Sequence, residues 1–104
     1  MTRRVVLHPA AVNDIREAAQ WYDHRSPGLG RFVITELRRV IDRLRQFPEV
    51  YPQIKPGIRQ AAISRLPYHA IYAATDSSIL LIAVLHVRRH PHVLEQQITE
   101  RHPN

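Results

Sequence analysis

Arginine and histidine side chains follow the most apolar segment of this chain. The segment from Ile79 to Leu85 is apolar at every position, which is typical of a buried strand. The basic residues that follow it are His86, Arg88, Arg89 and His90. A guanidinium group can stabilise charge that develops on phosphate oxygens, and a histidine of near-neutral pKa can transfer protons. This order of residue types predicts an anion-binding or phosphodiester-handling site at the rim of a sheet.

The parity of each basic residue on its strand decides which face of the sheet it would occupy. Strict alternation places His86 and Arg88 on the face of the even-numbered residues of the apolar run. Those residues are Leu80, Ile82 and Val84. By the same rule Arg59 and Arg65 share a face of an earlier strand with Ile63. If the strand register aligns them, these guanidinium groups and the imidazole of His86 converge beside one sheet face.

Plainer interpretations of the same residues stay open. Charges are common at the solvated end of a strand, so Arg88 and Arg89 are equally well explained as solubilising residues. A histidine that ends an apolar run, as His86 does, is more often a hydrogen-bonded structural residue than a catalyst. Trp21, near the end of a predicted helix, is expected in the core rather than as a stacking platform.

No metal or cofactor is expected. His90 and His92 flank Pro91 at a spacing that could chelate a metal, but no carboxylate or further histidine stands at an established ligand spacing. The serines have no nucleophile-elbow context, and the three glycines form no phosphate-binding loop. With no cysteine, disulfides and thiolate metal sites are excluded.

The charge balance predicts an anionic partner. The chain has 104 residues and a formal net charge of +6, and Lys55 is the only lysine among its 15 basic residues. Arginine can grip phosphate or carboxylate with two parallel hydrogen bonds, so nucleic acid and an acidic protein both fit. No apolar run is long enough to span a bilayer, and we expect a cytoplasmic protein that does not contact membranes.

Hydrophobic periodicity predicts one small α+β domain over residues 1–104, in the order β-α-α-β-β-β. The expected elements are a strand at 5–7, helices at 10–23 and 29–47 that form a hairpin, and strands at 58–64, 68–75 and 78–87, the last two joined by a tight turn at 76–77. The loop before the second strand is expected to pack Tyr51 inward. Residues 93–104 are expected to be a flexible or partner-ordered tail with at most one loose helical turn.

The second predicted helix carries a basic stripe opposite its apolar face. The stripe consists of Arg31, Arg38 and Arg45, with Arg39 and Arg43 nearby. It could dock an acidic helix or nucleic acid. It could equally be an ordinary exposed face, partly neutralised by pairs of Asp42 with Arg38 and Arg45.

The order and spacing of several short motifs resemble the RelE/ParE superfamily of bacterial type II toxins. The motifs are residues 10–15, Trp21-Tyr22, the helix from Gly28 to Phe47, Phe47-Pro48, residues 57–59, residues 67–72 and residues 84–89. The ending at 85–89 looks most like the ParE branch, often labelled plasmid-stabilisation proteins. The resemblance implies a compact domain whose helical hairpin packs on a mainly antiparallel sheet. It also implies a toxin held inactive by a cognate antitoxin, with DNA gyrase as target. From the residues themselves we expect that antitoxin to be acidic, and the candidate target- or partner-binding residues are Arg31, Arg38, Arg45, Arg59, Arg88 and Arg89.

Two alternatives of different classes remain. The RelE branch cleaves messenger RNA on the ribosome with basic residues and usually a tyrosine near the C-terminal end. Here no tyrosine follows Tyr72, and the substitute set would be Arg59, Arg65, His86, Arg88 and His90. The other alternative is an inactive member that only binds an antitoxin or DNA.

Overall fold

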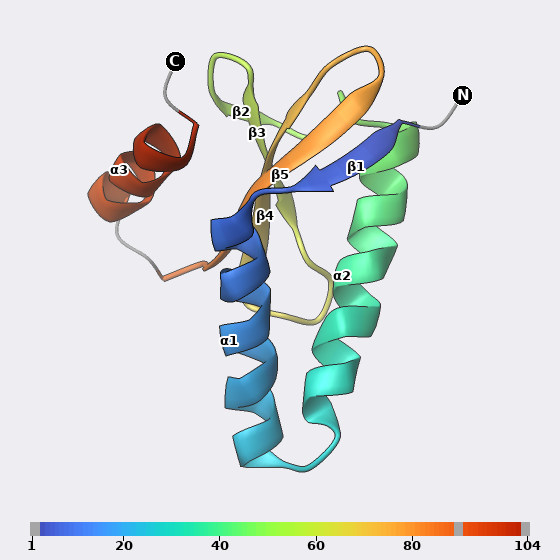
Figure 1. Ribbon diagram of the computed structural model, residues 1–104, viewed down its shortest axis with the longest axis vertical. Coiled ribbons are helices and arrows are strands. Elements are labelled where there is room, and N and C mark those ends of the chain that lie inside the picture. The colour runs from blue at the N-terminus through green and yellow to red at the C-terminus, as the bar shows by residue number, and fades with distance from the viewer. Residues whose placement is uncertain (1–2, 89–90, 103–104) are drawn as a thin grey trace.

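The computed structural model describes residues 3–88 and 91–102 and shows an α+β domain (Figure 1). The elements are β1 (Arg4–Leu7), α1 (Pro9–Arg25), α2 (Leu29–Gln46), β2 (Gln53–Lys55), β3 (Ile58–Ala62), β4 (Tyr68–Ala74), β5 (Ser78–His86) and α3 (Pro91–Arg101). The predicted class and the helical hairpin on a mainly antiparallel sheet are confirmed. Two elements were missed, since the loop before β3 contains the short strand β2, and an 11-residue helix replaces the single loose turn expected in the tail.

The helical hairpin is defined by caps that the sequence supplies. Pro9 begins α1 at a position where its missing N–H costs nothing, and His8 Nδ1 accepts a hydrogen bond from the Ala10 N–H at 3.0 Å. Asp23 Oδ1 accepts the N–H groups of Gly28 at 3.2 Å and Gly30 at 2.7 Å, which caps the first turn of α2. The hairpin therefore has a fixed turn rather than a loose connection.

The sheet has five strands in the order β1-β5-β4-β3-β2. β1 lies parallel to β5, and the other neighbours are antiparallel. β5 thus has a strand on each side along its first half and packed layers on both faces. This position explains why residues 79–85 are apolar throughout, because a strand buried on both faces has no polar side to alternate with.

A β-bulge in β5 changes which side chains share a face. Ile71 pairs with Ala83 and Tyr72 pairs with Leu81, so Ile82 is an extra residue on β5. Leu81 and Val84 therefore belong to one buried cluster, while Ile82 and Ala83 belong to the other. Leu80 and Ile82 share a face as expected, but the expectation was wrong for Val84, because alternation reverses at the bulge.

Two apolar clusters fill the two faces of the sheet. The α1–α2 hairpin covers one face, where Leu37 and Leu44 of α2 join Tyr72 and Leu81 of the sheet. On the other face Ile98 of α3 is 2% exposed and packs with Ile58, Ile71, Ile82, Ala83 and Leu85. The C-terminal helix is thus a third layer over the sheet, opposite the hairpin.

Candidate functional site

Arg59 and Tyr72 both fasten the turn that follows α2. Arg59 lies on β3 opposite Tyr72 of β4. Its Nη1 donates hydrogen bonds to the carbonyl oxygens of Tyr51 at 2.6 Å and Glu49 at 3.2 Å. The buried Tyr72 hydroxyl donates to the Pro48 carbonyl at 2.5 Å. The guanidinium of Arg59 therefore has a structural task in addition to any contact it makes with an anion.

Burial raises the pKa of Tyr72 to about 12, and the neighbouring ring of Tyr51 adds to the rise while the positive charge of Arg59 opposes it. The two tyrosine rings meet edge to face, with centroids 6.4 Å apart. The phenol consequently stays protonated at neutral pH and acts as a donor to Pro48. The expectation that Tyr51 packs inward agrees with this contact.

His86 ends β5 in a small cavity beneath α1. Its Nδ1 accepts the backbone N–H of Arg88 at 3.0 Å, and its ring meets Tyr68 edge to face at 5.3 Å. The cavity, of about 190 Å³, is also lined by Asp14, Glu17, Ala18, Trp21 and Val84. These contacts support the structural interpretation of His86. On β4, where His69 pairs with Leu85, burial lowers the pKa of His69 below its usual 6.5.

Trp21 is exposed, contrary to the expectation that it belongs to the core. Half of its surface, 50%, is open to solvent, and the guanidinium carbon of Arg25 lies 4.3 Å from the ring centroid. Trp21 lies near the end of α1 and lines the cavity with Val84 and His86 of β5, while half of its surface stays open to solvent. The cation–π contact leaves a large aromatic surface on this helix.

Arg65 lies in the β3–β4 connection with a positive φ of 67°. It lines a cavity of about 240 Å³ with Arg39 and Arg43 of α2 and the buried Glu36. Arg59, Arg65 and His86 line three separate cavities, so the structure does not bring them together as one set. Arg88 has an exposed side chain beyond β5. Arg89 and His90, the other predicted residues, lie outside the described residues.

The basic stripe on α2 is partly free and partly structural. Arg31 and Arg38 are exposed, whereas Arg45 Nε donates to the Arg3 carbonyl at 2.9 Å and ties α2 to the start of β1. The expected pairs of Asp42 with Arg38 and Arg45 are not found among the ion pairs of the described residues. The ion pair that α2 does make joins Arg39 to Glu36, a carboxylate only 2% exposed.

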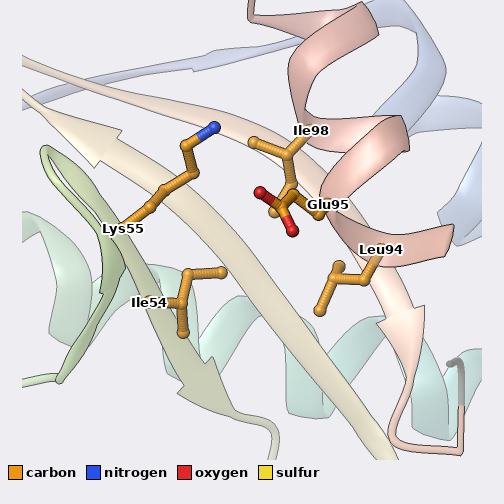
Figure 2. A pocket seen from close by; sticks show the side chains of 5 residues that line it. All are labelled: Ile54, Lys55, Leu94, Glu95 and Ile98. Atoms are coloured by element: carbon orange, nitrogen blue, oxygen red, sulfur yellow. The ribbon is translucent and has the colours of Figure 1, made fainter. Parts of the chain in front are cut away.

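An apolar groove between β2 and α3 was not predicted from the sequence. It encloses about 310 Å³ and is lined by Ile54 and Lys55 from β2 and by Leu94, Glu95 and Ile98 from α3. Figure 2 shows Ile54 and Leu94 on opposite sides of the opening. The spacing of Leu94 and Ile98, four residues apart, was the sequence signal that could have indicated an apolar helix face.

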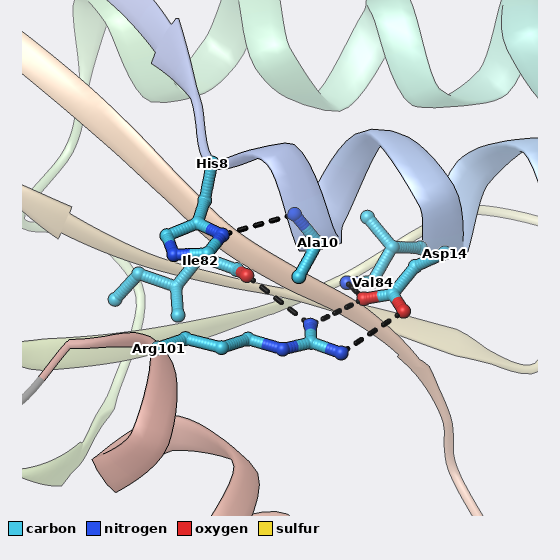
Figure 3. Close-up of polar contacts among 6 residues, drawn as sticks. All are labelled: His8, Ala10, Asp14, Ile82, Val84 and Arg101. Carbon is cyan, nitrogen blue, oxygen red and sulfur yellow. Dashed lines mark hydrogen bonds and ion pairs between the residues drawn. The ribbon is translucent and has the colours of Figure 1, made fainter.

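Asp14 and Arg101 form a clamp that was also missed (Figure 3). Arg101 makes two hydrogen bonds to the Asp14 carboxylate, at 2.6 and 3.2 Å, and a third to the Ile82 carbonyl at 3.2 Å. Asp14 also accepts the Val84 N–H at 3.0 Å. β1 pairs with β5 only as far as Leu81. Beyond that point Asp14 and Arg101 satisfy the Val84 N–H and the Ile82 carbonyl on the edge of β5 that β1 no longer covers. The clamp joins α1, β5 and α3.

The described residues include no group of three or more His, Cys, Asp or Glu side chains placed to hold a metal ion. Within the same part of the chain, no helix combines the length and apolarity that crossing a membrane requires.

The fold is a helical hairpin over a five-stranded sheet with arginines on its surface, the architecture expected for a toxin of the RelE/ParE superfamily. A family model described as "ParE toxin of type II toxin-antitoxin system, parDE" matches residues 5–91, and the chain belongs to this family. It is 28% identical to Toxin ParE2 of Mycobacterium tuberculosis over 102 residues, and this alignment covers 97% of each of the two chains. The structure resembles a chain of the chromosomal ParDE TA system from P. aeruginosa, with a TM-score of 0.61, 13% identity, and coverage of 82% of this chain and 96% of that one.

Proposed function

We propose that this ParE-family toxin arrests growth by binding and inhibiting DNA gyrase, without a catalytic step of its own. The observation that carries the proposal is that the Arg59 guanidinium is hydrogen-bonded to the carbonyls of Glu49 and Tyr51, so it holds the protein's own backbone. Two further candidates for phosphodiester chemistry, Arg65 and His86, line different cavities. Surfaces for binding are therefore better supported than a converged catalytic set.

We also propose that a cognate antitoxin neutralises the toxin with an acidic segment that orders on binding. The groove between β2 and α3 supports this, because it offers an apolar floor next to the short edge strand β2. An extended peptide can add to such an edge while its apolar side chains enter the groove. The groove carries one cation, Lys55, and one acid, Glu95, so it is the net charge of +6 of the whole chain that favours a negatively charged segment.

The experiment that tests the gyrase proposal is pulse labelling of DNA and protein synthesis during the first minutes after induction, followed by a supercoiling assay with purified gyrase. We expect DNA synthesis to stop first while translation continues, and supercoiling to be inhibited. An immediate stop of translation with normal supercoiling would instead support a ribosome-dependent ribonuclease.

Arg88 is the residue to replace when that ribonuclease alternative is tested. Its side chain is exposed, so Arg88→Ala should leave folding intact and abolish RNA cleavage only if the guanidinium acts on phosphate. Arg59→Ala is a poor test, since losing its hydrogen bonds to the 49–51 backbone would perturb the fold as well. Retained growth arrest in Arg88→Ala would count against a catalytic role for this residue.

A further inference from the structure

The turn between α2 and β2 presents two apolar side chains to solvent. Phe47 is 56% exposed and Val50 is 66% exposed, the two largest values among the large apolar residues of the described chain. The Val50 N–H donates to the Phe47 carbonyl at 3.3 Å, which closes a four-residue turn with Pro48 at its second position. Because the first and last residues of a β-turn lie close together, two exposed apolar residues stand near each other on this turn.

Contacts from the sheet hold this turn in place. The carbonyl of Pro48 is bound by the buried Tyr72 hydroxyl, and the carbonyl of Glu49 by Arg59. At its start, the Phe47 N–H donates to the Arg43 carbonyl at 2.8 Å, which anchors the turn to the end of α2. An exposed turn fixed by side chains from two strands is preorganised, so a partner that binds it does not have to order it.

The surroundings of the turn are mainly cationic. Arg43 and Arg45 precede it on α2, and Arg3 is joined to Arg45 by hydrogen bonds in both directions, at 2.9 and 3.4 Å. A shallow polar cavity beside it is lined by Arg3 and Arg59, with Glu49 and Asp76 as its acids. Figure 1 shows the end of α2, which carries Arg43 and Arg45, next to the start of β1.

We propose that Phe47 and Val50 are the residues by which the toxin contacts its cellular target, a folded protein with an apolar pocket and an acidic rim. The inference rests on the proposed function insofar as it assumes a target distinct from the antitoxin. Exposed apolar side chains on a turn whose backbone is held in place suit a preformed pocket, and aromatic residues such as Phe are enriched in protein interfaces. An antitoxin segment that orders on binding suits a groove, and the groove lies between β2 and α3.

The test compares the wild type with the double variant Phe47→Ser/Val50→Ser. The matched control is Val87→Ser, since Val87 is also apolar and 47% exposed but lies outside the turn. Three readouts are taken: growth arrest on induction, inhibition of purified gyrase, and affinity for the cognate antitoxin by calorimetry. Thermal unfolding confirms that each variant is folded. We expect the double variant to lose growth arrest and to need about tenfold more protein to inhibit gyrase, with antitoxin affinity changed by less than about twofold.

Full growth arrest by the folded double variant would overturn the inference, and so would an equal loss of antitoxin affinity. A wild type that arrests growth without inhibiting gyrase would refute the gyrase proposal alone. In that case growth arrest still decides the role of the turn, because its loss in the double variant supports a target contact and its retention excludes one. A wild type that does not arrest growth would overturn both.

Discussion

At the scale of single residues, the side chains with the most distinctive chemistry are used to hold backbone. Tyr72 is fully buried, and its hydroxyl is committed to the Pro48 carbonyl. Arg59 donates hydrogen bonds to the carbonyl oxygens of Glu49 and Tyr51. His86 accepts a hydrogen bond from the backbone N–H of Arg88. A residue type that is suitable for catalysis is equally suitable for satisfying buried polar groups, so identity alone could not separate the two roles.

Replacement of Tyr72 by Phe is expected to lower the free energy of unfolding by about 1–3 kcal/mol, because the buried Pro48 carbonyl would lose its donor. Tyr22→Phe is the control, as this ring packs against the same apolar cluster. Urea denaturation at neutral pH gives both values. A loss no greater than that of Tyr22→Phe would show that the hydrogen bond contributes little.

The same phenol should give the wild type a distinct alkaline transition. Its folded pKa of about 12 exceeds the ordinary value of 10.0, so the unfolded chain releases the proton first. The stability that Tyr72 contributes is therefore complete below pH 10 and is lost as the pH rises toward 12. Urea denaturation at successive pH values above 9 should show a steeper decline for the wild type than for Tyr72→Phe. Equal slopes would contradict the raised pKa.

At the scale of elements, the clamp between Asp14 and Arg101 positions α3. The two side chains are 11% and 14% exposed, so each would be poorly solvated without the other. Asp14→Asn or Arg101→Gln is expected to cost about 2 kcal/mol or more, and the double variant less than the sum of the two. Denaturant unfolding of all four proteins measures the coupling.

The control for the clamp is Arg38→Gln, an exposed change on α2 that should stay within about 0.5 kcal/mol of the wild type. Strictly additive losses in the double variant would show that Asp14 and Arg101 act independently. The clamp would then be an incidental contact.

The hairpin depends on the absence of a side chain at Gly30. A Cβ at this position would lie 2.6 Å from Asp23 Oδ2 and 2.8 Å from the Ala19 carbonyl oxygen, closer than real contacts allow. Gly30→Ala is expected to destabilise the fold by about 1–3 kcal/mol, although alanine ordinarily favours a helix. Thr35→Ala, at an exposed site of the same helix, should be neutral or stabilising. A Gly30→Ala variant as stable as the wild type would show that the helices can separate without cost.

The two helices of the hairpin and the three long strands were predictable, because each repeats its apolar positions over several turns or residue pairs, whereas α3 was missed. The bulge in β5 was not, since a run that is apolar on both faces looks the same with or without an inserted residue. The three-residue strand β2 lies between Pro52 and Pro56, which indicate a loop. Strand parity predicts which face of the sheet Arg59 occupies. It does not predict its hydrogen-bonding partners, the carbonyls of Glu49 and Tyr51, which lie ten and eight residues earlier in the chain.

At the scale of the whole molecule, the net charge of +6 should govern how fast partners arrive. We expect the association rate with the proposed acidic antitoxin to fall steeply between about 0.05 and 0.5 M salt, while the dissociation rate changes less. Stopped-flow or surface-based kinetics would measure both rates. The exposed pair Arg31→Gln/Arg38→Gln should flatten the salt dependence, and an unchanged slope would mean that these residues lie away from the path of approach.

The parallel pairing of β1 with β5 has a consequence for how the toxin is made. Residues 4–7 pair with residues 78–81 of β5, and Asp14 forms its ion pair with Arg101, which lies 87 positions later in the chain. A growing chain can form the hairpin early, but its first strand has no neighbour until most of the protein has left the ribosome. The complete fold can therefore form only near the end of translation. That delay gives an antitoxin already present in the cell an interval in which the newly made toxin is still incomplete.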